Sequence, residues 1–107
     1  MLHDTLNRLE KIIKNSDKLS VAKKQELEKL AVELRKELAK LEKTDREHAH
    51  SIAGFTKLTA HEALRQQRDE KLLQHAYGGL QESIRKFEAT HPNLTRVLQQ
   101  ICASFGV

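Results

Sequence analysis

The sequence predicts an all-α protein in which long amphipathic helices form a helical hairpin or bundle with coiled-coil character. The 107 residues include only 4 Gly and 1 Pro, so few positions interrupt a helix. Leu, Ile and Val recur at intervals of three and four, which places them on one face of a helix. No stretch alternates apolar and polar residues with β-branched enrichment, as a half-buried strand does.

Length and composition indicate a single domain, residues 1–107. A chain of this length is near the lower end of what buries a useful core by itself. Charged residues make up 32% and aromatic residues only 4%, a profile typical of long helices or coiled coils. The net charge is +4, but Lys and Arg are interleaved with Glu and Asp. Interleaved charges predict solvated helix faces with ion pairs, and they leave little concentrated charge for phosphates.

The first half predicts two helices. One spans residues 2–15, with its apolar face at Leu2, Leu6, Leu9, Ile12 and Ile13. Ser20 is a candidate N-cap for the other, whose apolar positions follow the alternating intervals of a coiled-coil seam. These positions are Leu27, Ala31, Leu34, Leu38 and Leu41, continued in register by His48, Ile52 and Phe55. We therefore expect a helix over 20–55, although Asp45 breaks the pattern and the spacing leaves open one rod or two pieces. As one rod, at 1.5 Å per residue, it is roughly 50 Å long.

A third helix is expected over residues 70–90. Gly54 and the Thr-x-x-Glu pattern of Thr59–Glu62 mark an interruption before it, and Asp69 is a candidate cap. Gly78-Gly79 lies inside the apolar pattern, where each Gly costs about 1 kcal/mol relative to Ala. Two glycines at one place indicate a kink or the close approach of a neighbouring backbone, and we favour close packing.

The last helix is expected over residues 92–105. Pro92 occupies the first helical position, which needs no backbone N–H donor, and Thr90 or His91 precedes it as a cap. We interpret Thr90, His91 and Pro92 as a structural helix junction in which Phe87 packs beneath His91.

The C-terminal third resembles a known family. The residues that carry the resemblance are the hexapeptide Phe87–Pro92, Leu94 and the apolar ending Ile101–Val107, together with Ser51–Phe55 and Ala60–Ala63. They resemble a family of short bacterial proteins known only as a domain of unknown function, whose members end in Phe-Glu-x-Ser/Thr-His-Pro-x-Leu and an apolar tail. The resemblance implies a small helical protein of unassigned role, and it carries over no catalytic or binding residues.

No residue pattern predicts an enzyme, a metal site or a cofactor site. His48 and His50 are two apart and point to different faces of a helix, so they do not share an ion within one turn. A metalloprotease helix needs two metal-binding histidines four residues apart. His61 has no such partner, because residue 65 is Arg. Cys102 lies on an apolar face with no neighbouring base or cationic cluster to lower its pKa. We expect no catalytic residues, no metal and no cofactor.

The long apolar seam predicts self-association. A helix of roughly 50 Å exposes an apolar strip that the rest of a short chain does not cover, so a second copy is expected to pack along it. The protein is then an elongated, non-enzymatic scaffold or protein-interaction module. It is expected to be a dimer or tetramer to which a protein partner can also bind. The interface candidates are Leu27, Ala31, Leu34, Leu38, Leu41, Ile52 and Phe55.

Two other functions compete with self-association. A nucleic-acid accessory protein needs basic residues on one face, and the best candidates surround the first turn: Lys11, Lys14, Lys18, Lys23 and Lys24. The second alternative is attachment to a membrane surface through the first helix, but this helix has no Trp anchor and no strongly basic face. No apolar run approaches the ~20 residues of a membrane span, and the N-terminus lacks the layout of a signal peptide. With a single Cys, a cytoplasmic location is expected.

Overall fold

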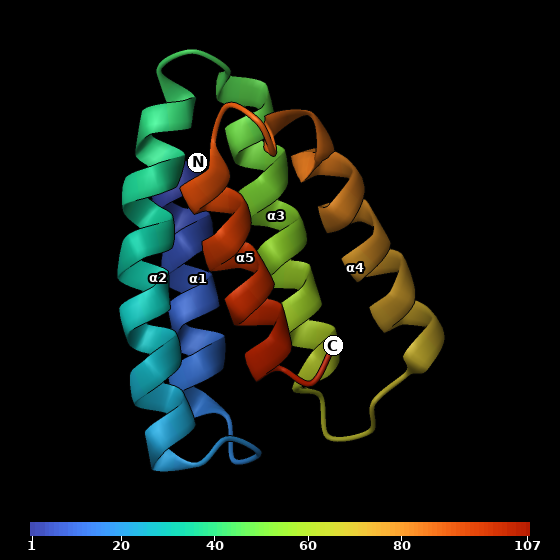
Figure 1. Cartoon of the computed structure of the whole chain (residues 1–107). Helices are drawn as coiled ribbons and strands as arrows, with labels where there is room; N and C mark the ends of the chain where they lie inside the picture. Colours follow the sequence, from blue (N-terminus) through green and yellow to red (C-terminus); the bar gives the residue numbers. More distant parts are fainter.

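The computed structural model describes residues 1–107, and it is all-helical, which confirms the predicted fold class. Consecutive helices alternate in direction and form a compact bundle (Figure 1). The elements are α1 (Leu2–Asn15), α2 (Val21–Glu42), α3 (Arg46–Ala63), α4 (Glu70–Ile84), the 3-10 turn η1 (Arg85–Phe87) and α5 (Pro92–Ser104). None of the five α-helices combines the length and the apolar character that crossing a bilayer requires.

Side-chain caps set the start of three helices. The Ser20 hydroxyl accepts a hydrogen bond from the Lys23 backbone N–H at 3.1 Å and begins α2. The Asp45 carboxylate accepts from the His48 N–H at 3.2 Å and begins α3. The Asp69 carboxylate accepts from Lys71 N–H at 3.0 Å and from the next residue at 3.2 Å, and begins α4. These oxygens satisfy donors that have no partner inside the helix.

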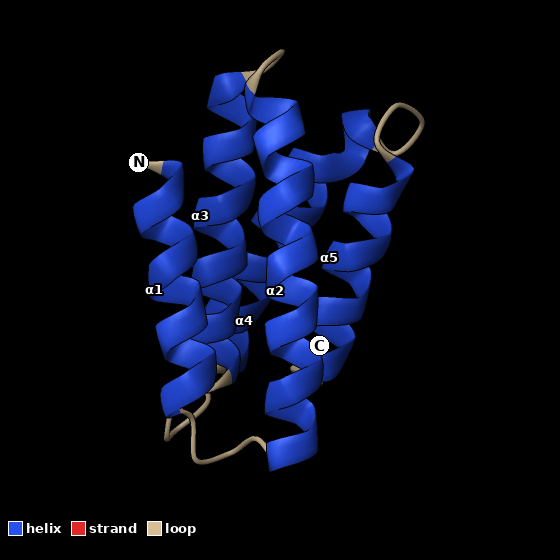
Figure 2. Cartoon of the chain, turned by 90° about the vertical axis from the view of Figure 1, so that its left-hand side faces the viewer, coloured by secondary structure: helices blue, strands red, loops and turns tan.

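The expected single helix over 20–55 is wrong. The chain turns at residues 43–45, and α2 and α3 pack side by side in opposite directions (Figures 1 and 2). α3 then continues through Gly54 to Ala63. The expected interruption at Thr59–Glu62 is also wrong, because these residues lie inside α3 and the Thr59 hydroxyl donates to the Phe55 carbonyl at 2.7 Å. The expected helix over 70–90 ends at Ile84 and tightens into η1.

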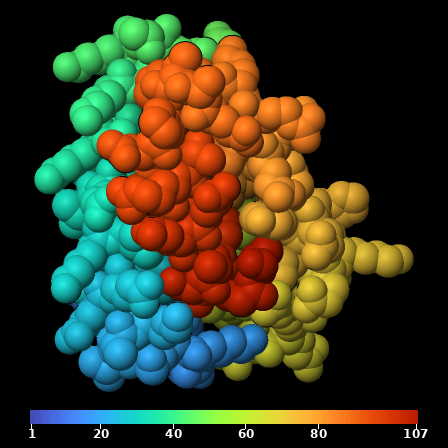
Figure 3. Space-filling model, in the orientation of Figure 1, coloured from blue at the N-terminus to red at the C-terminus, as the bar shows by residue number.

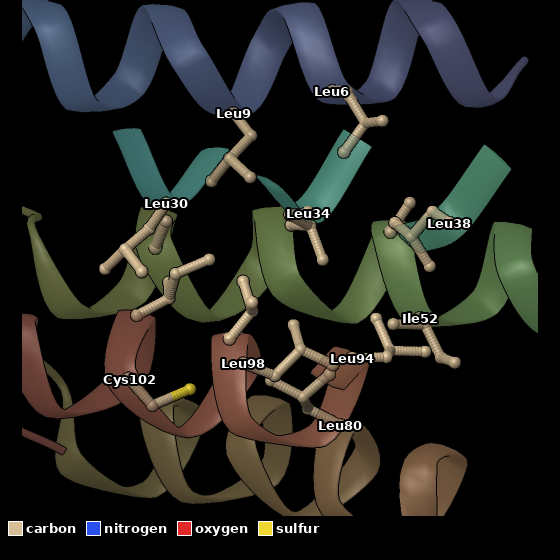
Figure 4. Packing of buried hydrophobic residues seen from close by; sticks show 14 of the residues in the cluster. Leu6, Leu9, Leu30, Leu34, Leu38, Ile52, Leu80, Leu94, Leu98 and Cys102 are labelled. Carbon is tan, nitrogen blue, oxygen red and sulfur yellow. The ribbon is translucent and has the colours of Figure 1, made fainter. Parts of the chain in front are cut away.

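One continuous core joins all five helices, and α2 and α3 are its central pair. α2 contacts α1, α3 and α5, and α3 contacts all four other helices. The core contains 24 buried apolar residues, and its side chains from α1, α2, α3, α4 and α5 point into one interior (Figure 4). The radius of gyration is 12.8 Å, close to the value of about 13 Å that a compact domain of this length has. The expected elongated shape is therefore wrong, since the principal extents are 37 × 27 × 23 Å.

Candidate interaction surface

The predicted oligomer interface lies in the core of the single chain. Six of its seven residues are at most 4% exposed. They are Leu27, Ala31, Leu34, Leu38, Leu41 and Ile52. The seventh, Phe55, is partly buried and packs against the same core. The turn at residues 43–45 folds the long seam back on itself, and α1 and α5 cover the rest (Figure 4). A second copy is not needed to cover this stripe, so the physical reason given for self-association is wrong.

The junction before α5 is closed by Phe87 and His91. The His91 backbone N–H donates to the Phe87 carbonyl at 2.7 Å, and the two rings meet edge to face with centroids 5.6 Å apart. The Thr90 hydroxyl lies 3.0 Å from Nδ1 of His91, and Pro92 occupies the first turn of α5. All of these contacts are made within the chain, so Thr90, His91 and Pro92 close the turn between η1 and α5.

The five lysines proposed for nucleic acid do not form one free basic face. Lys18 Nζ donates to the backbone carbonyls of Arg65 and Gln66. Lys24 Nζ donates to the Lys14 carbonyl at 3.1 Å, and Lys23 lies 4.0 Å from the Glu26 carboxylate. Of the five, only Lys11 and Lys14 have ammonium groups without a protein partner. Three of the five ammonium groups are thus held by contacts within the chain.

A different basic surface lies along the seam between α1 and α3, which run side by side (Figure 2). We call it the basic groove. It is lined by Arg8, Lys11 and Ile12 of α1 and by Lys57, Leu58 and His61 of α3. Ile12 and Leu58 supply its apolar surface, and Leu58 is 40% exposed. The groove therefore combines uncovered apolar surface with cations from both helices.

The cations of the basic groove have no acidic partners. Arg8, Lys11 and Lys57 take part in none of the eleven ion pairs of the molecule. Some other basic side chains bridge helices to carboxylates: Arg35 reaches Glu10 at 3.0 Å, and two further pairs join α5 to α2 and η1 to the turn before α3. Single cations without an ion pair also occur elsewhere, as at Lys29 and Lys36 of α2. Three cations without partners in one groove indicate a surface whose charge is not neutralised within the chain.

The groove continues toward the end of α3. Ile12 and His61 also line the adjoining hollow, which extends to Leu64 and Arg65. Arg65 Nη1 donates to the Glu62 carboxylate at 2.8 Å, and this bond with its charge raises the pKa of the Arg65 guanidinium. Glu62 is buried and held by Arg65, and its second carboxylate oxygen lies 4.0 Å from Nε2 of His61, so this carboxylate lies beside one end of the basic groove.

The basic groove was not predicted from the sequence. Its two halves are about 50 residues apart in the chain, and only the packing of α1 on α3 joins them. One local signal was present, since Leu58 lies outside the apolar stripe of its helix and has Lys57 beside it. Taken alone, an isolated surface Leu is ordinary and carries no information about function.

A second hollow lies between α4 and α5, which border it on the face seen in Figure 3. Its apolar lining includes Tyr77, Leu80 and Cys102, and Gln81 and Arg85 stand among its polar residues. Its volume is about 200 Å³. Burial raises the pKa of the Cys102 thiol to about 12, because the charged thiolate is disfavoured away from water. The thiol is therefore neutral at physiological pH and is a poor nucleophile.

Two of the six histidines lie within 3.0 Å of a carboxylate, and the histidines do not converge on a shared point. His50 Nε2 lies 2.9 Å from Glu42, and His48 Nδ1 lies 3.0 Å from Asp45. No group of three or more His, Cys, Asp and Glu side chains has the geometry to hold a metal ion.

A family model with the description "Domain of unknown function (DUF4404)" matches residues 33–106. The match begins within α2 and extends through α5, and it therefore includes the α3 side of the basic groove and leaves α1 outside. No curated protein and no solved structure matches the chain.

Proposed function

We propose that this chain, which belongs to the family described as a domain of unknown function (DUF4404), is a non-enzymatic helical module that binds another protein. The observation that carries the proposal is the basic groove. It joins unpaired cations to partly exposed apolar side chains on two helices that the core holds in place. Surfaces that combine an apolar centre with a charged rim are typical of protein interfaces.

Two features support a role without catalysis. The only thiol of the chain, Cys102, is held neutral by burial. The hollow that contains it, at about 200 Å³, is smaller than the roughly 300 Å³ at which small-molecule sites begin. Neither hollow brings together a nucleophile, a base and an orienting group in hydrogen-bond contact, as nucleophilic catalysis requires.

Self-association through the Leu-rich stripe has no place in this proposal, because Leu34 and its neighbours are buried within one chain. Nucleic-acid binding is the alternative, and it draws on the same Lys and Arg side chains. The basic groove contains no Phe, Tyr or Trp ring on which a base could stack, and its apolar residues contribute nothing to phosphate contacts.

Site-specific photo-crosslinking in the cells that naturally produce the protein tests the proposal. A benzophenone amino acid is placed at Leu58, inside the basic groove, and as a control at Val32, which is 53% exposed on α2. We expect a defined protein adduct from position 58 that is lost when Arg8→Glu and Lys57→Glu are added, and none from position 32. An adduct with nucleic acid would favour the alternative. Equal adducts from both positions, or no adduct, would reject the proposal.

A further inference from the structure

We infer that the partner presents an amphipathic helix whose apolar stripe is flanked by acidic residues, and that this helix lies along the basic groove. The inference rests on the proposed function and names the chemistry of the partner. Its apolar side chains would contact Ile12 and Leu58, and its carboxylates would reach the cations of α1 and α3. Grooves with an apolar floor commonly take helices that place apolar residues at intervals of three and four.

Charge complementarity selects the acidic partner. Arg8 and Lys11 lie on α1 and Lys57 lies on α3, so cations stand on both sides of the helix seam. Arg8, Lys11 and Lys57 are paired with no carboxylate of their own chain. A carboxylate on each flank of the incoming helix therefore gains an ion pair without breaking an existing one, whereas a basic partner meets repulsion.

The dimensions of the groove limit the contact to a short helical segment. From Lys57 to Ala63, where α3 ends, the helix advances six residues, which is about 9 Å or fewer than two helical turns. A contact of this length is small for a protein interface, so we expect weak binding that falls with added salt.

The lining of the basic groove is partly apolar and partly charged, which favours a protein helix over a nucleic acid as the bound partner. Leu58 is exposed in the groove, and burying it against a partner removes apolar surface from water. A nucleic-acid backbone gains nothing from that burial. Because the basic groove has both cations and an apolar floor, we expect the affinity to depend on the order of residues in the partner as well as on its net charge.

A designed peptide tests this inference. The peptide has about 15 residues, enough for a marginally stable helix, with Leu at intervals of three and four and Glu on both flanks. The controls are a peptide of identical composition in scrambled order and a DNA duplex of comparable charge. Binding to the full chain is followed by fluorescence anisotropy at about 50 mM and about 300 mM salt.

Two charge-reversed proteins complete the experiment. Arg8→Glu with Lys57→Glu changes the basic groove. Lys29→Glu with Lys36→Glu changes net charge equally on exposed α2 positions that form no ion pair and lie outside it. Circular dichroism confirms that both remain helical. We expect the groove variant to bind the ordered peptide roughly tenfold more weakly, and the α2 variant to bind within about twofold of the natural chain.

Equal binding of ordered and scrambled peptides, equal loss in both variants, or tighter binding of DNA would overturn the inference. The two proposals fail separately. If the adduct at position 58 is found and the peptide does not bind, the partner chemistry is wrong and the interaction module stands. If neither is found, both proposals are rejected.

Discussion

A single carboxylate, Asp45, ties the turn between α2 and α3 to η1, which lies at the same end of the bundle (Figure 1). It accepts the His48 backbone N–H and lies 3.0 Å from the Nδ1 atom of the same residue. Lys86 of η1 reaches it at 3.5 Å. The hydrogen bonds from His48 and the charges of His48 and Lys86 favour the ionised form and lower the pKa of Asp45 below its ordinary 3.8. The residue therefore caps α3 and holds η1 beside it.

Replacing Asp45→Asn is expected to lower the free energy of unfolding at pH 7, because Asn still caps a helix but carries no charge for His48 and Lys86. A depressed folded pKa contributes stability above the unfolded value and loses it as the pH falls through the folded value. The gap between the natural chain and the variant should thus close as the pH falls below 3.8.

Urea denaturation followed by circular dichroism across pH measures this gap. Asp69→Asn is the matched control, since Asp69 also caps a helix but has no His partner. A loss for Asp45→Asn that stays constant from pH 7 down to strongly acidic solution would contradict the assigned role.

At the scale of the elements, the two adjacent glycines of α4 have different surroundings. A Cβ atom at position 79 would overlap the Phe55 ring of α3, whereas one at position 78 would meet no atom within 4 Å. The absence of a side chain at Gly79 is thus what lets α4 approach α3. The predicted close packing holds for one glycine of the pair, and the neighbour it admits is a side chain and not a backbone.

The changes in the free energy of unfolding caused by Gly78→Ala and by Gly79→Ala should therefore differ in sign or size. Both gain about 1 kcal/mol of helix propensity, so their difference isolates the packing. We expect Gly78→Ala to stabilise the protein and to exceed Gly79→Ala in stability by about 1–3 kcal/mol, the usual cost of overpacking. Chemical denaturation of both variants measures this difference.

A second background checks the cause of that difference. In a Phe55→Leu chain the ring that obstructs position 79 is gone, so the two alanine variants should become nearly equal in stability. If the gap remained in that background, contact with Phe55 would not be its origin.

At the scale of the whole molecule, the core closes within one chain. All five helices contribute buried residues, and no large apolar stripe is left for a second copy to cover. The large apolar side chains that stay exposed are separated along the chain: Met1, Val21, Val32, Leu58 and Leu72. We therefore predict a monomer of 12.3 kDa in dilute solution.

Light scattering across a sizing column, at low and at high salt, measures this mass. The expected result is the monomer mass at both salt concentrations, because a buried core does not depend on screening. A dimer that persists at high salt would contradict the prediction and would place an apolar interface on a face other than the Leu-rich stripe.

Much of the local structure was predictable. The all-α class follows from helical periodicity and the scarcity of Gly and Pro, and the caps Ser20 and Asp69 lie where their helices begin. The turn at residues 43–45 was missed although Asp45 is a good N-cap. The apolar register continues from Leu41 through His48 to Ile52, and that spacing fits one straight helix or two antiparallel helices equally well.

The sequence by itself determined which side of each helix is apolar, because periodicity and capping depend on residues within one or two turns of each other. Only the tertiary structure decided what covers those sides. It folded α3 back on α2, buried the stripe around Leu34 within one chain, and brought Lys57 beside α1 to form the basic groove. The physical reason is that apolar burial is non-directional. A stripe must be covered, but its spacing does not say by which helix, or whether by the same chain or another.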